Sequence, residues 1–427
     1  MNRKLFAGFV VGALVAAAII SQRGLGQTAA AQAKQMPVFE ADATFFKPLP
    51  NGWQTGQGSA IAVDKNDNVW WFHRPQYVPA DKKAAPAVLQ FDSTGKFIKG
   101  WGGPSAGYDW FDQEHGIYVD DNDFVWLTGS ARPALGGAFG KVLRSDNMIL
   151  KFTSDGKFVK QIGKRDTSTG NNDTMNVYSA TDLSVDVKTN EVYVADGYIN
   201  HRVIVFDATT GAFKRMWGAF GNVPMDSPNQ LQNARTSRAP AAAAPAGGGA
   251  AAGGGRGAGG CGGRGNAAAA PAGPAPDPMQ AQQFQGPVHS AKVSKDGFVY
   301  VADRGGNRLQ VFTTAGKFVN QIKVTSPSGF AISSDPDQRF LYIAEYGANH
   351  VGVVDRKTLE ILYEFGMESD KPGDFQGPHE LAVDSKGNLY VAEVAPGNRW
   401  QKLTFKGLST TKPANALTAA QLAAPQQ

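Results

Sequence analysis

Short runs of alternating hydrophobic and polar residues, separated by turns rich in Gly, Asp and Asn, recur along most of the chain. Such alternation predicts antiparallel β-strands. One unit, GPHELAVDSKGNLYVAE from Gly377 to Glu393, has two apolar strands on either side of the turn DSKGN. A third strand follows, and a fourth closes each unit in segments such as KFTSDGKFVKQIG and FTTAGKFVNQI. Four-stranded units that repeat at about 40–50 residues are typical of propeller blades.

Six such units can be counted. They start near Gly58, His115, Ser179, Gly286, Ser328 and Gly377. The pattern therefore predicts an all-β fold, a six-bladed β-propeller of four-stranded antiparallel blades over residues 38–407. The sixth unit ends soon after its third strand. We expect its outer strand to come from the segment around Phe39 to Phe46, which would close the ring.

Three segments do not follow the repeat. Residues 1–33 have the pattern of a signal peptide, with two basic residues, an apolar run from Leu5 to Ile20 and a small-residue site at Ala31-Gln32-Ala33. This predicts a secreted or periplasmic protein with no stable membrane span after cleavage; an uncleaved anchor is the alternative. Residues 233–281 are dominated by Ala, Gly and Pro and predict a disordered insertion between the third and fourth blades. Residues 408–427 predict a flexible tail.

The charge of the chain does not suggest a nucleic-acid partner. The formal net charge of +5 falls to about +2 without residues 1–33, which carry Arg3, Lys4 and Arg23 and no acidic residue. We therefore expect no nucleic-acid binding. Cys261 is the only cysteine, so no disulfide can form within the chain.

One register of the repeat carries a histidine in every second unit. Aligning the units on their second strand places His115, His289 and His379 in this column, with Ser59, Thr181 and Phe330 in the intervening units. The first strand of a blade lines the central channel, and alternate blades of six lie a third of a turn apart, so the three imidazoles are expected to converge. Three histidines with a fourth position open are typical of a catalytic zinc site. The alternative is that each is an ordinary hydrogen-bonded residue of the channel wall.

Residues that follow the second strand of a blade lie at the same end of the ring as the histidines, because the first two strands are antiparallel. They include Arg74, Tyr198 and Arg304. Two guanidinium groups near a dication predict an anionic ligand, most simply a carboxylate. Tyr198 is a candidate proton acceptor in this setting. The alternative is that these are ordinary turn residues. The long, Gly-rich loop from Thr128 to Asn147 is placed to cover or reshape the site.

Several motifs together resemble a known family. They are FHR (Phe72 to Arg74), His115–Gly116, DGYINHR (Asp196 to Arg202), PVHS (Pro287 to Ser290) with ADRGGNR (Ala302 to Arg308), and GPHE (Gly377 to Glu380). The repeats resemble NHL repeats, and the set of motifs is similar to peptidyl-alpha-hydroxyglycine alpha-amidating lyase (peptidylamidoglycolate lyase). The resemblance covers about residues 55 to 405, apart from insertions. VADRGGNRLQVF alone is common to NHL propellers, whereas the combination is more specific.

The resemblance implies a six-bladed enzyme that splits a peptidyl-alpha-hydroxyglycine into a peptide amide and glyoxylate. It implies that His115, His289 and His379 bind zinc, that Tyr198 is the catalytic base, and that Arg74 and Arg304 bind the substrate. It further implies a calcium ion in the channel, held by the carbonyls of Ile61 and Ile117 and the carboxylate of Glu380, where the family has Asp.

We therefore expect a secreted, zinc-dependent carbon–nitrogen lyase acting on a small molecule or peptide that bears a carboxylate. Two alternatives remain open. One is a non-catalytic NHL propeller that binds a peptide, a glycan or a protein partner, which the fold alone does not exclude. The other is a different metal-dependent lyase or hydrolase that uses the same ring of residues.

Overall fold

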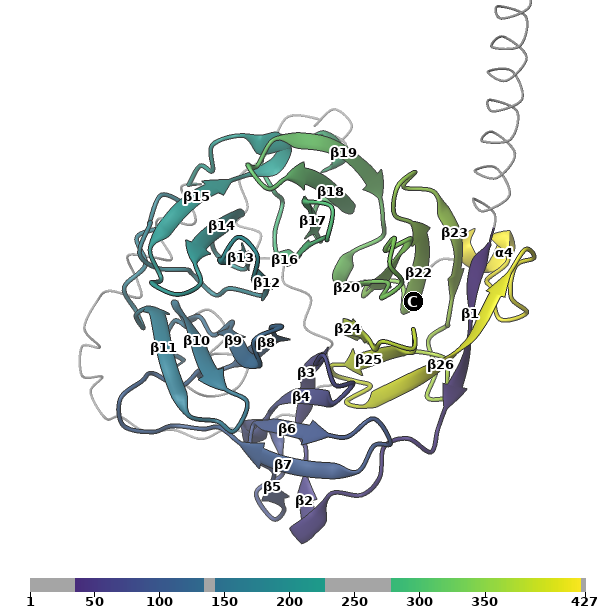
Figure 1. Cartoon of the computed structure of the whole chain (residues 1–427), viewed down its shortest axis with the longest axis horizontal. Coiled ribbons are helices and arrows are strands. Elements are labelled where there is room, and N and C mark those ends of the chain that lie inside the picture. Colours follow the sequence, from purple (N-terminus) through teal and green to yellow (C-terminus); the bar gives the residue numbers. More distant parts are fainter. Residues whose placement is uncertain (1–34, 134–142, 227–277, 424–427) are drawn as a thin grey trace, which may run out of the picture.

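The computed structural model describes residues 35–133, 143–226 and 278–423. Within them the chain forms six four-stranded antiparallel sheets around a central channel (Figure 1). The predicted six-bladed β-propeller is confirmed. A two-stranded parallel sheet of β2 (Trp53–Gln54) and β5 (Lys83–Ala84) is added at the edge of the first blade.

Blades 1 to 5 each use four successive strands of the main repeat. Blade 1 contains β3 (Gln57–Val63), β4 (Val69–Arg74), β6 (Val88–Phe91) and β7 (Phe97–Trp101), and blade 2 contains β8 (Glu114–Val119), β9 (Phe124–Gly129), β10 (Met148–Thr153) and β11 (Phe158–Gly163). Blade 3 contains β12 (Asp182–Asp186), β13 (Glu191–Asp196), β14 (Arg202–Asp207) and β15 (Phe213–Trp217). Blade 4 contains β16 (Val288–Val293), β17 (Phe298–Asp303), β18 (Arg308–Thr313) and β19 (Phe318–Lys323), and blade 5 contains β20 (Pro327–Ile332), β21 (Phe340–Glu345), β22 (His350–Asp355) and β23 (Ile361–Phe365).

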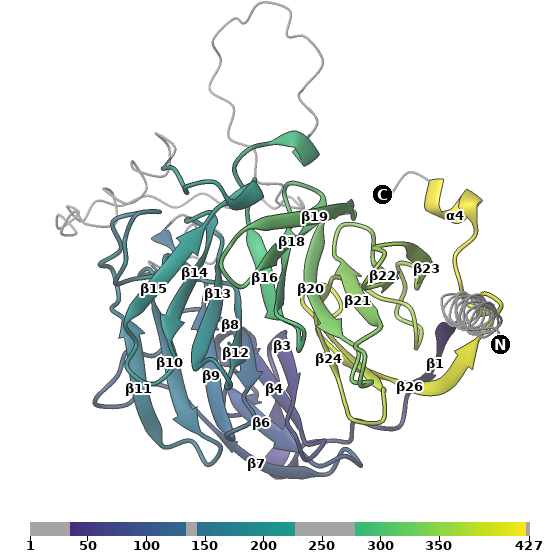
Figure 2. The same ribbon diagram turned by 45° about the horizontal axis from the view of Figure 1, so that its top comes forward.

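Blade 6 joins the two ends of the described chain. Its strand order is β1-β26-β25-β24, with β1 (Met36–Asp42), β26 (Trp400–Ser409), β25 (Leu389–Glu393) and β24 (Pro378–Val383). Figures 1 and 2 show the purple β1 beside the yellow β26. Phe39 pairs with Phe405, as expected for a ring closed by the N-terminal segment. The strand ends at Asp42, and Phe46 packs instead on Trp71, with ring centroids 4.7 Å apart.

A recurring contact holds the inner two strands of a blade together. The turn between them begins with an aspartate whose carboxylate accepts backbone N–H groups of the turn. The same carboxylate accepts a bond from an aromatic side chain of the second strand, in the pairs Asp64–Trp70, Asp120–Trp126 and Asp384–Tyr390, at 2.8–3.0 Å. The buried donor of each aromatic side chain is hydrogen-bonded in this way, and the contact ties the turn to the second strand.

The segments predicted to lie outside the propeller are only partly described. Residues 1–33 and most of 233–281, with Cys261, fall outside the described residues. In the predicted tail, β26 continues to Ser409, the N–H of Leu417 donates to the carbonyl of Glu364, and α4 spans Ala419–Ala423. Among the described residues, no helix has the length and apolar character needed to cross a bilayer.

Candidate metal centre and substrate cavity

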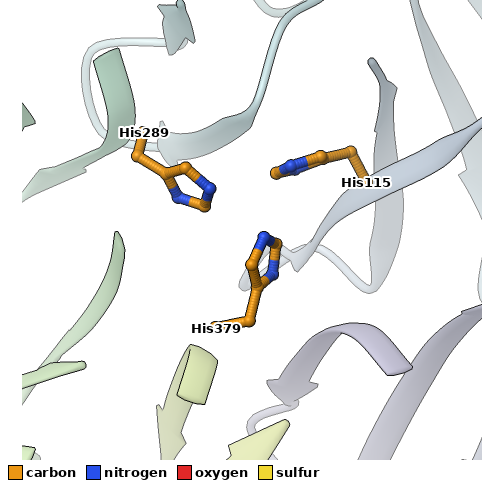
Figure 3. A group of neighbouring side chains, drawn as sticks. All are labelled: His115, His289 and His379. Carbon is orange, nitrogen blue, oxygen red and sulfur yellow. The ribbon is translucent and has the colours of Figure 1, made fainter. Parts of the chain in front are cut away.

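The three predicted histidines converge on one point of the channel. His115, His289 and His379 come from β8, β16 and β24 of blades 2, 4 and 6, and Figure 3 shows their rings turned towards one another. One ligand atom from each lies within 4.8 Å of the other two, and the ring centroids are 4.7–5.1 Å apart. Each histidine sits where strand pairing is interrupted by a bulge, which re-aims a side chain.

Two of the imidazoles are oriented by backbone carbonyls of the intervening blades. His115 Nδ1 lies 2.7 Å from the carbonyl oxygen of Thr181, and His379 Nδ1 lies 2.6 Å from that of Ser59. A carbonyl only accepts, so Nδ1 carries the proton and donates in both rings. The lone pair is thereby left on Nε2, and hydrogen bonds of this kind are the usual outer support of metal-binding histidines.

His289 supplies the test of whether a metal fits. It is fully buried, and neither ring nitrogen has a hydrogen-bond partner among the described residues. A buried polar group without a partner is costly, so an imidazole in this state indicates a missing ligand. A metal ion between the three rings would bind one of these two nitrogens, and the set of three nitrogen donors suits zinc.

Burial also sets the protonation state of the triad. It lowers the pKa of His379 to about 3, with Arg74 adding a smaller effect. The pKa values of His115 and His289 are well below the ordinary value, first through burial and then through the neighbouring His379. All three rings are therefore neutral at physiological pH, which is the form that binds metals.

The alignment predicted Phe330 at the histidine position of blade 5, and this was wrong. In β20, Ser328 and Gly329 stand where β8 has His115 and Gly116, opposite the same part of the second strand. Ser328 Oγ lies 3.0 Å from the carbonyl of Pro378 and 3.2 Å from that of Ala344, whereas Phe330 is buried in the apolar contact between blades 4 and 5. The turn between the first two strands is longer in blade 5, where Ile332 pairs with Leu341, than in blade 2, where Val119 pairs with Val125. Counting back from the second strand therefore misses the equivalent position in blade 5.

A cavity of about 230 Å³ opens beside His379. Residues at or just after the ends of the second strands supply most of its wall, and they include Arg74, Arg132, Tyr198, Arg304, Tyr346 and Val394. The predicted site residues Arg74, Tyr198 and Arg304 are thus brought together with the histidines. Three arginines and no acidic side chain line this cavity among the described residues, which makes it suited to an anion.

Tyr198 links the cavity to the histidines. Its hydroxyl donates to His115 Nε2 at 3.1 Å. The guanidinium carbon of Arg132 lies 4.2 Å from the centroid of the Tyr198 ring, a stacked cation–π contact. Arg74 is buried and held by the Glu114 carbonyl at Nε and by Gln57 Oε1. These contacts fix both predicted groups in place before any ligand binds.

Sequence reasoning missed Arg132 and Tyr346. Arg304 stacks on Tyr346 at 4.2 Å, so the cavity has two arginine–tyrosine pairs. Tyr346 follows β21 in IAEYGANH as Tyr198 follows β13 in VADGYINH, and this likeness could have revealed it. Arg132 comes three residues after β9, within the Gly-rich loop, of which residues 134–142 lie outside the described residues.

His73, next to Arg74, is not part of the metal centre. Its Nδ1 accepts from the N–H of Gly56 at 3.1 Å, and its Nε2 donates to the carbonyl of Pro86 at 2.9 Å. Burial lowers the pKa of His73 to about 4. A neutral ring with both nitrogens satisfied is a structural residue.

The predicted calcium donors lie away from the histidine triad and its cavity. Ile61 and Ile117 line a second cavity, of about 410 Å³, at the other mouth of the channel, and Lys292 lines it too. Glu380 is buried with its Oε1 3.3 Å from the ammonium of Lys292. Burial, together with the nearby carboxylate of Asp182, raises the pKa of Glu380 to about 8. Lys292 thus already places a cation beside Glu380, while Glu380 Oε1 and Asp182 Oδ1 have no hydrogen-bond partner among the described residues.

Comparison with known proteins adds distant relatives. No family model matches the chain. A probable peptidyl-alpha-hydroxyglycine alpha-amidating lyase of Caenorhabditis elegans is 22% identical over 388 residues, covering 85% of this chain and 87% of that protein. Peptidyl-glycine alpha-amidating monooxygenase B of Xenopus laevis is 23% identical, covering 82% of this chain. Mouse NHL repeat-containing protein 3 is 30% identical over 142 residues, 30% of this chain.

The chain has NHL-repeat relatives, and its resemblance to an amidating lyase extends over most of its length. It spans only 34% of the Xenopus protein and 41% of the mouse protein. Among solved structures, a streptogramin B lyase matches with 12% identity and a TM-score of 0.45, covering 87% of this chain and 98% of the other. That likeness does not bear on the chemistry of the site.

Proposed function

We propose that this protein is a zinc-dependent carbon–nitrogen lyase that cleaves a peptidyl-alpha-hydroxyglycine or a similar carbinolamide into an amide and glyoxylate. The observation that carries the proposal is the buried histidine triad, with His289 unpartnered, beside a cavity with three arginines and Tyr198. The distant relatives that carry the names amidating lyase and amidating monooxygenase support the same class of reaction.

The position of each residue in the site suggests its role in metal or substrate binding. His115, His289 and His379 would hold the metal, which when bound supplies a Lewis acid for a hydroxyl or carboxylate oxygen. Arg74, already fixed by two hydrogen bonds, and Arg304 face the cavity and would hold the carboxylate of the substrate. The apolar wall at Val394 and Ala395 would receive the acyl group.

Tyr198 is placed to move the proton. Its hydroxyl borders both the cavity and His115 Nε2. Because a metal would use the Nε2 lone pair, the tyrosine oxygen would then face the substrate. As a phenolate, it would accept the proton of the α-hydroxyl as the C=O bond of glyoxylate forms and the C–N bond breaks. Return of the proton to the leaving nitrogen gives the amide, with no net proton consumed.

Arg132 extends the proposal to specificity. Arg132 lines the cavity, its guanidinium lies over the ring of Tyr198, and its Nη1 donates to the carbonyl of Ser130 at 3.2 Å. We assign it to a carbonyl or second anionic group on the acyl side of the substrate. We propose, from the predicted signal peptide, that the protein acts in the periplasm or the medium.

The test uses N-benzoyl-alpha-hydroxyglycine as substrate and zinc-loaded protein. The proposal predicts that benzamide and glyoxylate appear in equal amounts, above the spontaneous rate. A panel of N-acyl-alpha-hydroxyglycines with acidic, neutral and basic acyl groups then defines specificity. Zinc-loaded, folded protein that releases no glyoxylate from any of them would exclude the lyase and favour a propeller that only binds its partner.

A further inference from the structure

The largely buried side chain of Lys292 extends across the channel beyond the histidine triad. Lys292 lies in β16, three residues after His289, and its Nζ is 2.7 Å from Asp182 Oδ2 and 3.3 Å from Glu380 Oε1. The side chains of Asp182, Glu380 and Lys292 are 0%, 2% and 14% exposed. Since Asp182 is in β12 and Glu380 in β24, one lysine joins blade 4 to blades 3 and 6.

The two carboxylates are fixed independently of the lysine. Asp182 Oδ2 also accepts a hydrogen bond from Ser290 Oγ at 2.6 Å. Glu380 is pressed against the backbone of blade 5, where a Cβ added to Gly329 would lie 2.6 Å from the Glu380 carboxyl carbon. Neither carboxylate can retreat to solvent, so a cation between them offsets a desolvation cost that each would otherwise carry.

A calcium ion does not fit beside this ammonium. Calcium binds carboxylate oxygens at about 2.3–2.6 Å. An ion on Glu380 Oε1 would therefore lie at most about 6 Å from Lys292 Nζ, which is 3.3 Å from the same oxygen. Two cations at that separation repel each other in a channel of low dielectric constant. Ile61 and Ile117, whose carbonyls are the other donors suggested by the family resemblance, line the same cavity as Lys292.

We propose that Lys292 is the resident cation of the channel and takes the place of a structural calcium ion. The propeller and its histidine triad then need no calcium. Removal of the ammonium leaves Asp182 and Glu380 unpaired and creates a site for an external dication, with oxygen donors of the kind that calcium prefers. This inference concerns the channel and does not depend on the lyase activity.

The test compares Lys292→Met with a matched control, Lys295→Met. Lys295 lies on the turn after β16, is exposed and lines the same cavity. Each protein is gel-filtered into calcium-depleted buffer that contains zinc, and calcium content and Tm are measured with and without 5 mM CaCl₂. Terbium luminescence excited through tryptophan and tyrosine reports a dication in the channel.

Wild type and Lys295→Met are expected to contain no calcium and to have the same Tm with and without CaCl₂. Lys292→Met is expected to melt at least about 5 °C lower and to recover most of the loss in CaCl₂, with terbium bound. Lys292→Arg keeps the charge and should need no calcium, which covers the case in which Lys292→Met fails to fold.

Three results would overturn the proposal. One is stoichiometric calcium in wild type whose removal lowers its Tm. The second is a Lys292→Met variant as stable as wild type without calcium. The third is a Lys292→Arg variant that folds only when calcium is added.

Discussion

Removal of the Tyr198 hydroxyl separates a catalytic from a structural role. In the structure this hydroxyl donates to His115 Nε2 at 3.1 Å, while the ring stacks against Arg132. Tyr198→Phe keeps the ring and its cation–π contact and deletes one oxygen atom. The fold and the zinc site should therefore persist, because none of the three histidines is altered.

The expected magnitudes differ between activity and stability. A positioned general base contributes about 10²–10⁴-fold to the rate, which is about 3–5 kcal/mol of activation free energy. One hydrogen bond from the half-buried Tyr198 contributes only about 0.5–1.5 kcal/mol to the free energy of unfolding. We therefore predict that Tyr198→Phe lowers kcat at least 100-fold and shifts Tm by only a few degrees.

The assay is glyoxylate release from N-benzoyl-alpha-hydroxyglycine, with zinc content measured on the same preparations. Tyr108→Phe is the control, because the Tyr108 hydroxyl also makes a 3.1 Å bond, to the Gly103 carbonyl, at a half-buried position away from the cavity. It should retain wild-type turnover. A Tyr198→Phe enzyme with full zinc and a kcat within threefold of wild type would refute the assignment of Tyr198 as the base.

Three further predictions follow from the same contacts. Arg132→Met should lower kcat/KM for N-acyl-alpha-hydroxyglycines about tenfold, mainly through KM, with zinc unchanged; identical steady-state constants would contradict its place in the substrate cavity. Metal-free protein should lose stability as pH falls from about 6.5 towards 3, because the unfolded chain takes up a proton at His379 that the folded chain, with its lowered pKa, does not. Melting curves of His379→Gln should show a weaker pH dependence. Gly329→Ala should lower the free energy of unfolding by about 1–3 kcal/mol and reduce zinc occupancy, because its Cβ would lie 2.6 Å from both the Glu380 carboxyl carbon and the His379 carbonyl oxygen; an unchanged Tm would show that the backbone yields there.

The repeat explains why so much of the fold was predictable. Strand alternation and Gly/Asp/Asn turns recur often enough to count six blades, and the missing strand of blade 6 identified the segment around Phe39 as the closing strand. The histidine column was predictable because equivalent positions of a closed ring face one axis. Its threefold spacing then gave the convergence of His115, His289 and His379.

The remaining features could not be predicted from the spacing of residues in the repeat. Ser328 replaces Phe330 in the column because the turn between β20 and β21 is longer than the turn between β8 and β9. Arg132 lies beyond the end of its strand, so only the path of the loop brings it onto Tyr198. The bridge from Lys292 to Asp182 and Glu380 joins strands of three blades far apart in sequence, and side-chain reach across a channel cannot be deduced from periodicity.

The metal content of the mature protein, measured by elemental mass spectrometry after purification without added metal, tests the histidine site. It is compared with a variant in which His115, His289 and His379 are all replaced by Ala and whose fold is verified by circular dichroism. If the histidine triad binds metal, each wild-type chain should contain about one tightly bound zinc, or a substituting transition metal, and the folded variant none. Wild-type protein that contains no transition metal and takes up no added zinc would contradict the central claim.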